Sequence, residues 1–182
     1  MIIKNGCATL RAIEEKDFDL LFFLINDPDI EKMTGGWHVP IGSAEQKAWI
    51  ANYRNTEKNI RLMIELENGK TIGMISLTDI DLKNRTAEIN YKIHANVEDR
   101  IRGDMKDAIN GILKYAFYEL GLNCILSVIL EYNTFAIKLA KKMHFSQEGI
   151  LRQRIYKNGK FNNQICFSLL KEEFDSYPNN ED

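Results

Sequence analysis

The sequence lacks any apolar run approaching the ~18 residues needed to cross a membrane. Its first residues, MIIKNGCATLRAIEEKDF, also lack the apolar stretch of a secretory signal. Charge of one sign is not in excess, because 24 basic and 26 acidic residues give a formal net charge of −2. This balance argues against a protein that coats nucleic acid or adheres to a membrane surface. We therefore expect a cytoplasmic protein with neither nucleic-acid nor membrane partners.

Cysteine is scarce as well. Cys7, Cys124 and Cys166 are odd in number and widely spaced, which favours buried free thiols over a disulfide framework. No metal cofactor is expected. The sequence also contains no internal repeat, low-complexity tract or interdomain linker, and 182 residues with 45% hydrophobic content suit one domain with a substantial core. We assign residues 1–176 to that domain and expect residues 177–182 to be a frayed tail.

The pattern of apolar residues predicts a single α/β domain of the α+β type. Asn68-Gly69 separates two alternating segments and Asn158-Gly159 separates two others, so each pair is expected to form a hairpin. Residues 124–130 are almost continuously apolar, which predicts a central strand buried on both faces. Strands are expected at residues 8–13, 61–67, 70–79, 86–94, 124–130, 149–156 and 164–170. Helices are expected at residues 14–26, 43–53, 105–120 and 133–145, the second with a capping box at Ser43 to Gln46.

The helix at residues 105–120 has one apolar stripe. Its members recur at spacings of four, three, four and four residues: Met105, Ile109, Ile112, Ala116 and Leu120. Gly121 follows the last of them and fits a left-handed C-terminal cap. Gly111, inside the helix, should cost about 1 kcal/mol relative to alanine.

A loop precedes this helix and follows an extended segment. It reads Arg100-Ile101-Arg102-Gly103-Asp104-Met105. Backbone N–H groups at a helix N-terminus are unpaired and the helix dipole favours negative charge there. The loop is therefore a candidate phosphate cradle, in which Gly103 permits close approach and the two arginines add positive charge.

The chain resembles the acetyl-coenzyme-A-dependent N-acetyltransferases of the GNAT superfamily, in particular the branch of the ribosomal-protein N-terminal acetyltransferases. The resemblance rests on Ala87-Glu88-Ile89, Arg-x-x-Gly at Arg100 and Gly103, residues 115–122, Asn133 with Ala136-Ile137, and residues 148–160. It implies one GNAT-like domain with a mixed, mostly antiparallel, splayed sheet flanked by helices. It also implies transfer of an acetyl group from acetyl-CoA to a primary amine of a small molecule or protein N-terminus.

The resemblance further implies where the ligands bind. The pantetheine arm and acetyl group would lie along the backbone of a splayed strand, here Tyr91, Lys92, Ile93, His94 and Ala95. The pyrophosphate would lie over residues 100–105, and Asn133 would contact the pantetheine, although asparagine is also an ordinary helix N-cap. Trp37 and His38 fall in the region that walls the acceptor pocket; they could equally cover the edge of the core.

Acetyl transfer to an amine needs a base for the nitrogen and a proton for the leaving thiolate. Glu88 is the candidate base, acting directly or through water, because partial burial raises a carboxyl pKa; the alternative is a carboxylate that only fixes strand geometry. The family usually has an acid-donating tyrosine where this chain has Ala140. Tyr132 is a weaker candidate for the missing acid, and water is another.

Two further departures concern the phosphate loop. Met105 places a bulky residue where the family signature ends in glycine or alanine, and the Asp104 carboxylate could cap the helix in place of a phosphate. Together with Ala140, these departures keep open a catalytically impaired GNAT-fold module that binds ligand or forms a homodimer. The acceptor also stays open among ribosomal-protein N-termini, polyamines, aminosugars and antibiotic amines.

Overall fold

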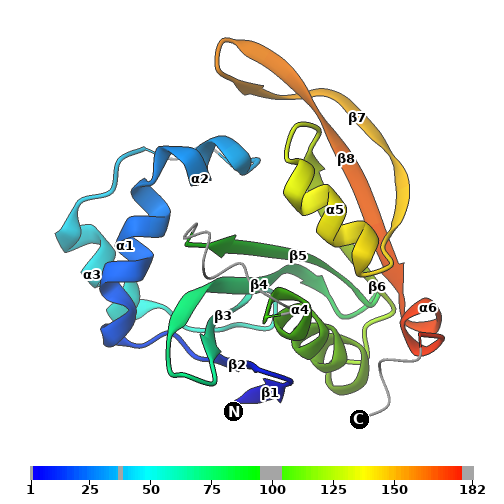
Figure 1. The fold of residues 1–182 in the computed structure, drawn as a ribbon, viewed down its shortest axis with the longest axis horizontal. Helices are drawn as coiled ribbons and strands as arrows, with labels where there is room; N and C mark the ends of the chain where they lie inside the picture. The colour runs from blue at the N-terminus through cyan, green and yellow to red at the C-terminus, as the bar shows by residue number, and fades with distance from the viewer. Residues whose placement is uncertain (1, 37–38, 95–103, 178–182) are drawn as a thin grey trace.

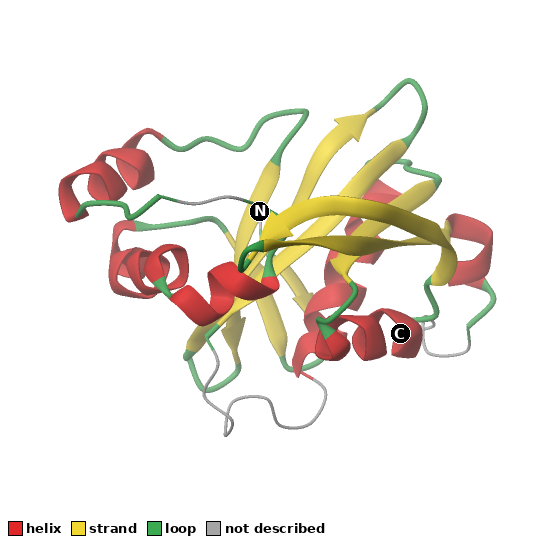
Figure 2. Cartoon of the chain, turned by 90° about the horizontal axis from the view of Figure 1, so that it is seen from above, coloured by secondary structure: helices red, strands yellow, loops and turns green. Residues whose placement is uncertain are grey.

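An eight-stranded sheet runs through the protein in the order β1-β2-β3-β4-β5-β6-β8-β7 (Figure 1). The computed structural model describes residues 2–36, 39–94 and 104–177. All neighbouring strands are antiparallel except β5 and β6, which are parallel. The expected α/β domain with a mixed, mostly antiparallel sheet is thereby confirmed. Helices flank the twisted sheet (Figure 2).

The strands and helices are bounded as follows. The strands are β1 Ile3–Asn5, β2 Ala8–Arg11, β3 Ile60–Leu66, β4 Thr71–Asp81, β5 Thr86–Ile93, β6 Cys124–Leu130, β7 Ser146–Lys157 and β8 Lys160–Leu170. The α-helices are α1 Phe18–Asn26, α2 Pro28–Met33, α3 Ser43–Asn52, α4 Asp104–Lys114, α5 Thr134–Lys142 and α6 Lys171–Asp175. A 3₁₀ turn at Glu15–Asp17 precedes α1, and a π-helical turn at Tyr115–Glu119 extends α4. No helix among the described residues is long and apolar enough to span a membrane.

Both predicted hairpins are confirmed. Gly69 has a φ of 78° between β3 and β4, and Asn158 and Gly159 have φ values of 53° and 75° between β7 and β8. Between β7 and β8, a two-residue turn with both residues at positive φ matches the right-handed twist of the strands that it joins. These short-range signals therefore fixed the pairing of four strands.

Three short elements were absent from the sequence prediction: β1, α2 and α6. Asp27 ends α1 as predicted but also begins α2, because its Oδ1 accepts from the N–H groups of Asp29 and Ile30 at 2.9 and 2.8 Å. The predicted capping box at Ser43 is wrong. Gly42 is the N-cap of α3, so the Ser43 hydroxyl lies one residue inside the helix.

Gly111 has a packing role in α4. A Cβ atom at this position would lie 3.2 Å from the Asn5 Cβ and 3.6 Å from Ile3 Cγ2, so its absence lets the helix approach β1 closely. The N-terminal part of α4 is also tied to this edge. The backbone N–H of Cys7 donates to the Asp107 carboxylate at 3.0 Å, and Asn5 Nδ2 donates to the Asp107 carbonyl at 3.1 Å. The β1–β2 hairpin thus positions the start of α4.

Strand β6 lies between β5 and β8, as its apolar sequence predicted. The prediction that both faces are buried is wrong, because Leu126 is 37% exposed while Ile125 on the opposite face is 0% exposed. The covered face packs under α4 and α5 within the main core. Three residue pairs join β5 to β6, namely Thr86 with Cys124, Ala87 with Ile125, and Glu88 with Leu126, and beyond them the described strands diverge.

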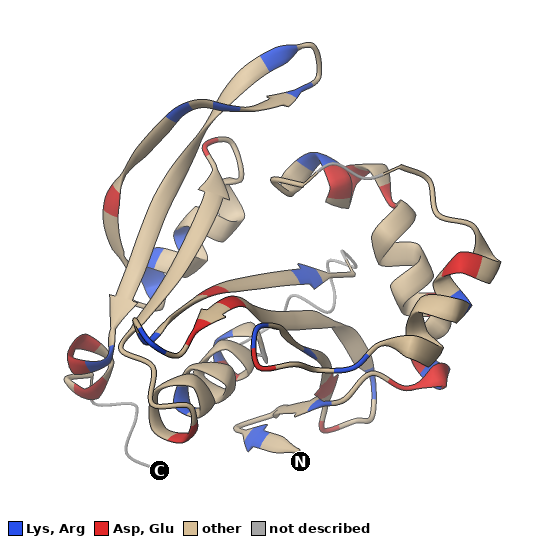
Figure 3. Cartoon of the chain, turned by 180° about the vertical axis from the view of Figure 1, so that it is seen from behind, with Lys and Arg blue, Asp and Glu red and all other residues tan. Residues whose placement is uncertain are grey.

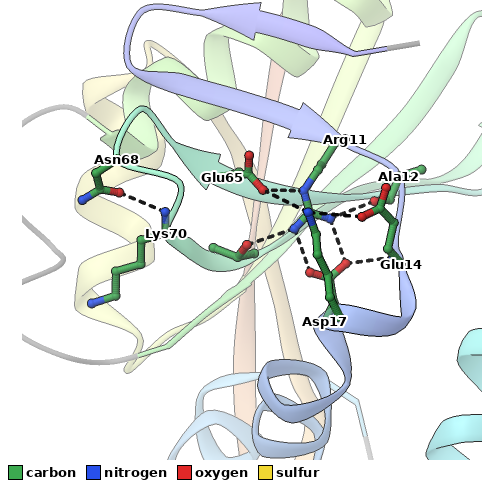
Figure 4. A network of polar contacts seen from close by, with 9 residues as sticks. Arg11, Ala12, Glu14, Asp17, Glu65, Asn68 and Lys70 are labelled. Atoms are coloured by element: carbon green, nitrogen blue, oxygen red, sulfur yellow. Dashed lines mark hydrogen bonds and ion pairs between the residues drawn. The ribbon is translucent and has the colours of Figure 1, made fainter.

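A charge cluster at the N-terminal side of the sheet fixes β2 to the turn before α1 (Figure 4). The Arg11 guanidinium donates to both Asp17 carboxylate oxygens at 2.8 and 2.7 Å and to Glu65 at 2.6 Å. Asp17 Oδ2 also accepts from the Glu14 N–H at 2.8 Å. Such a bidentate pair with further hydrogen bonds is the geometry in which buried charges are tolerated.

Candidate active site

A cavity of about 660 Å³ opens on the sheet face that lies opposite α4. Its floor is formed by three neighbouring rungs of strands β3, β4 and β5. Thr78 pairs with Glu88 in the first rung, Arg61, Ser76 and Asn90 form the second, and Met74 pairs with Lys92 in the third. All seven side chains line the cavity, because alternate residues of a strand share one face.

The wall opposite the floor is mainly apolar. It comes from α1, α3 and the segment between α2 and α3: Leu21, Leu24, Ile25, Val39, Ile41 and Trp49. The far side is formed by Val128 of β6 and Gln164 of β8. Gly35 lies close to Gln164, where a Cβ would meet Gln164 Nε2 at 2.8 Å. A small residue at position 35 thus leaves room for this contact between the two halves of the cavity.

Glu88 lies at the point where β5 and β6 begin to diverge. Burial raises the pKa of its carboxyl, the charge of nearby Asp79 raises it further, and a hydrogen bond with Asn90 partly opposes both effects. None of the ion pairs within the described residues involves Glu88. A half-buried carboxyl whose proton is held more tightly than usual is suited to accept a proton near neutral pH.

Lys92 lies on the same strand face as Glu88. Burial lowers the pKa of its ammonium, and the charges of Lys157 and Arg61 lower it further, whereas Glu31 raises it. The Arg61 guanidinium lies over the Tyr53 ring at 5.4 Å. The floor of the cavity therefore carries a carboxyl at one end and two cationic side chains toward the other.

Tyr91 points to the opposite side of β5 from Glu88 and Lys92 and packs against the main core. It lines a void of about 10 Å³ together with Ala140, Ile89 and Ser127 among others. Burial raises the pKa of the Tyr91 hydroxyl to about 12. The buried Ala140 of α5 thus lines the same void as Tyr91 of β5.

The last carbonyl groups of α2 are capped from the other half of the sheet. Lys157 Nζ donates to the Glu31 carbonyl and carboxylate, both at 2.5 Å, from the end of β7. The Tyr132 hydroxyl donates to the Lys32 carbonyl at 2.7 Å, and Asn133 Nδ2 donates to the Met33 carbonyl at 3.0 Å. Three successive carbonyls of a helix C-terminus are satisfied in this way. This bridge joins α2 to β6, α5 and β7.

The bridge changes the interpretation of two predicted site residues. Tyr132 donates its only hydroxyl proton to α2, so in this conformation it does not offer that proton elsewhere. Asn133 is the N-cap of α5, since its Oδ1 accepts from the Ala136 N–H at 3.1 Å, while its amide group holds Met33. The structural role that the sequence left open for Asn133 is therefore present, and a cofactor contact would have to share or replace these bonds.

The other predicted site residues that the structure describes lie in or next to β5 and α4. His94 contacts Phe23 with tilted rings whose centroids are 4.5 Å apart, and Ile93 packs against the core. Met105 also packs against the core, so its side chain points inward rather than toward the region before α4. Asp104 begins α4, and its side chain is outside the description. Trp37, His38, Ala95, Arg100, Ile101, Arg102 and Gly103 lie outside the described residues.

The floor residues that flank Glu88 belong to no motif that the sequence displays. Arg61, Ser76, Thr78 and Asn90 were placed in strands but were not assigned to the site. The predicted hairpin at Asn68-Gly69 together with strand alternation would have placed Arg61 and Ser76 opposite each other. Among the described residues, no three histidine, cysteine, aspartate or glutamate side chains group as they would around a metal ion.

Comparisons with known proteins agree with this geometry. The sequence model for the acetyltransferase (GNAT) domain matches residues 8–146. The prophage-derived N-acetyltransferase YokL of Bacillus subtilis (strain 168) is 29% identical over 167 residues, which cover 92% of each chain. The putative ribosomal N-acetyltransferase YdaF of the same organism is 30% identical over 181 residues, which cover 94% of this chain and 95% of the relative.

A solved structure shows the same fold. The spermidine N-acetyltransferase of Vibrio cholerae, in complex with CoA and spermine, superposes with a TM-score of 0.84 at 24% identity and covers 94% of this chain and 100% of that chain. The match of the domain model over most of the chain is the decisive finding. The chain belongs to the GNAT family of N-acetyltransferases.

Proposed function

We propose that this N-acetyltransferase moves the acetyl group of acetyl-CoA to a primary amine bound in the cavity of about 660 Å³, with Glu88 as the general base. The observation that carries the proposal is the position of Glu88. Its half-buried carboxyl has a raised pKa, lines the cavity floor, and lies where β5 and β6 diverge. An acceptor in the cavity and a cofactor between the diverging strands would thus meet beside this carboxyl.

Acetyl-CoA would supply the activated acetyl thioester. The divergence of β5 from β6 leaves backbone groups of β5 unpaired on that side within the described chain, which fits an extended, peptide-like pantetheine arm. The backbone from Tyr91 to Ala95 would hold that arm. The loop of residues 100–105, with Arg100, Arg102 and Gly103, would hold the pyrophosphate.

The chemistry required of the chain begins with the amine. A primary amine with a pKa near ~10.4 arrives largely as the ammonium, so it must lose a proton before it can attack. Once the first proton has passed to water, the nitrogen lone pair would attack the thioester carbonyl carbon and the C–S bond would break. The second proton lost from nitrogen would pass to Glu88 directly or through water. Asn90, hydrogen-bonded to Glu88, orients the carboxyl for this transfer.

Departure of the thiolate needs less help. A thiol with a pKa of ~8.5 is an acceptable leaving group near neutrality even without a positioned acid. Ala140 offers no proton and the Tyr132 hydroxyl is engaged with Lys32. We therefore expect measurable but modest turnover, with water as the source of the proton.

An acetylation assay tests the proposal directly. A panel of primary amines, including polyamines, aminosugars and a peptide with a free N-terminus, is incubated with acetyl-CoA while thiol release is followed. Glu88→Gln should lower kcat/KM on any accepted amine by on the order of 10²–10⁴-fold, because it keeps the side-chain shape and the Asn90 contact but cannot accept a proton.

Glu45→Gln is the matched control, because Glu45 also lines the cavity but comes from α3 rather than from the floor. It should leave kcat within a small factor of the parent. Equal losses in the two variants would assign Glu88 a general electrostatic role instead of proton transfer. CoA binding without acetylation of any amine would favour the catalytically impaired module.

A further inference from the structure

The charges that line the cavity are balanced rather than acidic. Among the described lining residues, two are acidic, Glu45 and Glu88, and two are basic, Arg61 and Lys92. Acidic and basic segments are likewise interspersed over the molecule in Figure 3. A polyamine that has one nitrogen at the reacting position still carries further ammonium groups, and these would have to lie near Arg61 and Lys92. Like charges brought together in a half-buried site are unfavourable.

The two cations lie away from the reacting end. Glu88 and Lys92 are four residues apart on one face of β5, so their Cα atoms are ~13 Å apart. Arg61 is on β3 in the rung between them, opposite Ser76. An acceptor that reaches from Glu88 along the floor therefore meets Arg61 and Lys92 with the part of the molecule that does not react.

Arg61 and Lys92 also influence each other. The charge of Arg61 is among the causes that hold the pKa of Lys92 below its usual value, as is the charge of Lys157, whereas Glu31 acts in the opposite sense. Lys157 and Glu31 are paired with each other at 2.5 Å. The Arg61 guanidinium lies over the Tyr53 ring. Its N–H groups lie in the guanidinium plane and not toward the ring, so they can still donate to a ligand. An anion between Arg61 and Lys92 would relieve the repulsion between them and accept hydrogen bonds from both.

We propose that the acceptor is a primary amine that also carries an anionic group, a carboxylate or a phosphate, bound between Arg61 and Lys92 while the amine reaches Glu88. This inference rests on the proposed function and names its substrate class. The apolar side chains of Leu21, Leu24 and Trp49 line the same cavity. An acceptor with an apolar middle, rather than a second amine, fits that wall.

Matched acceptor pairs test the inference. The carboxylate arm compares ε-aminocaproate with its neutral amide, and the phosphate arm compares aminopentyl phosphate with aminopentanol; spermidine represents polyamines. We expect kcat/KM for the anionic member of at least one pair to exceed that of its neutral partner by on the order of tenfold to a hundredfold. The arm with the larger ratio identifies the anion.

Variants separate anion binding from catalysis. Arg61→Gln and, independently, Lys92→Gln should raise KM for the preferred anionic acceptor by on the order of tenfold, with kcat and the KM of the neutral partner nearly unchanged. Arg54→Gln is the matched control. Arg54 is exposed, and its guanidinium donates to the Ala51 and Tyr53 carbonyls and does not line the cavity.

The outcomes are distinguishable. Preference for spermidine, equal kcat/KM within both pairs, or equal KM changes for neutral and anionic acceptors in the Arg61 and Lys92 variants would each overturn this inference, while the proposed acetyl transfer would stand. If no amine in any arm is acetylated, the proposed function fails and this inference fails with it.

Discussion

Asp17 and Glu88 are both carboxylates withdrawn from solvent, but their surroundings differ. The Asp17 side chain is 2% exposed and is held by both terminal nitrogens of Arg11 and by the Glu14 N–H. Hydrogen bonds from Arg11 to Asp17, in turn, raise the pKa of the arginine. Glu88 has an amide partner, Asn90, and a nearby like charge, Asp79, and its pKa is raised by burial.

The contrast separates a charge that holds the fold from a charge that is available for chemistry. Where a buried ion is paired and hydrogen-bonded by its neighbours, it holds one arrangement of the chain. Where a carboxyl is buried without a cation, the folded state is less stable when it is ionised, and the group is a candidate for proton transfer. The predictions below alter one side of this contrast at a time.

The largest expected effect follows from removing the paired cation. Arg11→Met should lower the free energy of unfolding by about 3–5 kcal/mol, because Asp17 and Glu65 lose their shared partner inside the protein. Denaturant unfolding measures the change. Lys16→Met is the control, because the Lys16 side chain is 59% exposed and its pairs with Glu14 and Glu65 should contribute less than about 1 kcal/mol. Similar losses in both variants would contradict the importance of burial.

The second prediction concerns the proton for the leaving thiolate, which Ala140 cannot donate. Ala140→Tyr should raise turnover by up to ~10²-fold if proton delivery to the thiolate limits the rate. The void beside Ala140 is only about 10 Å³, so overpacking should also lower stability by about 1–3 kcal/mol. Ala140→Phe has nearly the same bulk without the hydroxyl. If the tyrosine and phenylalanine variants have equal turnover, the absence of a hydroxyl at position 140 does not limit the rate.

The third prediction concerns stability rather than rate. The folded-state pKa of Glu88 is raised above its usual 4.5, so the native protein binds this proton more tightly than the unfolded chain. Ionisation of Glu88 therefore opposes folding once the pH rises from 4.5 through the folded-state pKa. Glu88→Gln should be more stable than the parent at pH 7, and the difference should vanish below pH 4.5. A variant that is less stable at pH 7 would make Glu88 a structural carboxylate like Asp17.

The smallest expected effect tests the like charge near Glu88. Asp79→Asn should lower the pKa of Glu88 and move the acidic limb of the activity profile to lower pH by less than about one pH unit. Asparagine is suited to this position, where φ is 51°. Asp81→Asn, two residues further along β4, is a control for general charge loss and should leave the profile in place. A profile unchanged in the Asp79 variant would remove Asp79 from the electrostatics of the site.

Much of the fold was predictable from short-range patterns. The Asn-Gly turns, the apolar stripe from Met105 to Leu120 and the left-handed Gly121 each involve neighbours within a few residues, and the structure confirms them. The resemblance also predicted Glu88 and its strand as part of the site. What it could not supply is the environment of Glu88, which depends on Asp79 and Asn90 across a turn and along the strand.

Local sequence patterns could not predict the contacts that join the two halves of the molecule. Tyr132 and Asn133 bond to carbonyls 100 residues earlier in the chain, in a helix of six residues that was absent from the sequence prediction. A side chain near a strand end can cap such a helix or bind a ligand, and its sequence neighbours are the same in either case. Only the tertiary fold places Lys32 and Met33 within reach.

The early divergence of β5 and β6 has a consequence for hydrogen exchange. The three residue pairs that join the described parts of the two strands end at Glu88 and Leu126. Backbone N–H groups point alternately to the two neighbours of a strand, so alternate amides of β5 after Glu88 face the gap rather than β6. In the middle of an eight-stranded sheet, these amides should exchange with deuterium as quickly as those of a loop, while the amides between them, bonded to β4, exchange slowly. When a ligand binds in the gap and its amide groups bond to β5, the amides that face the gap should exchange as slowly as those bonded to β4.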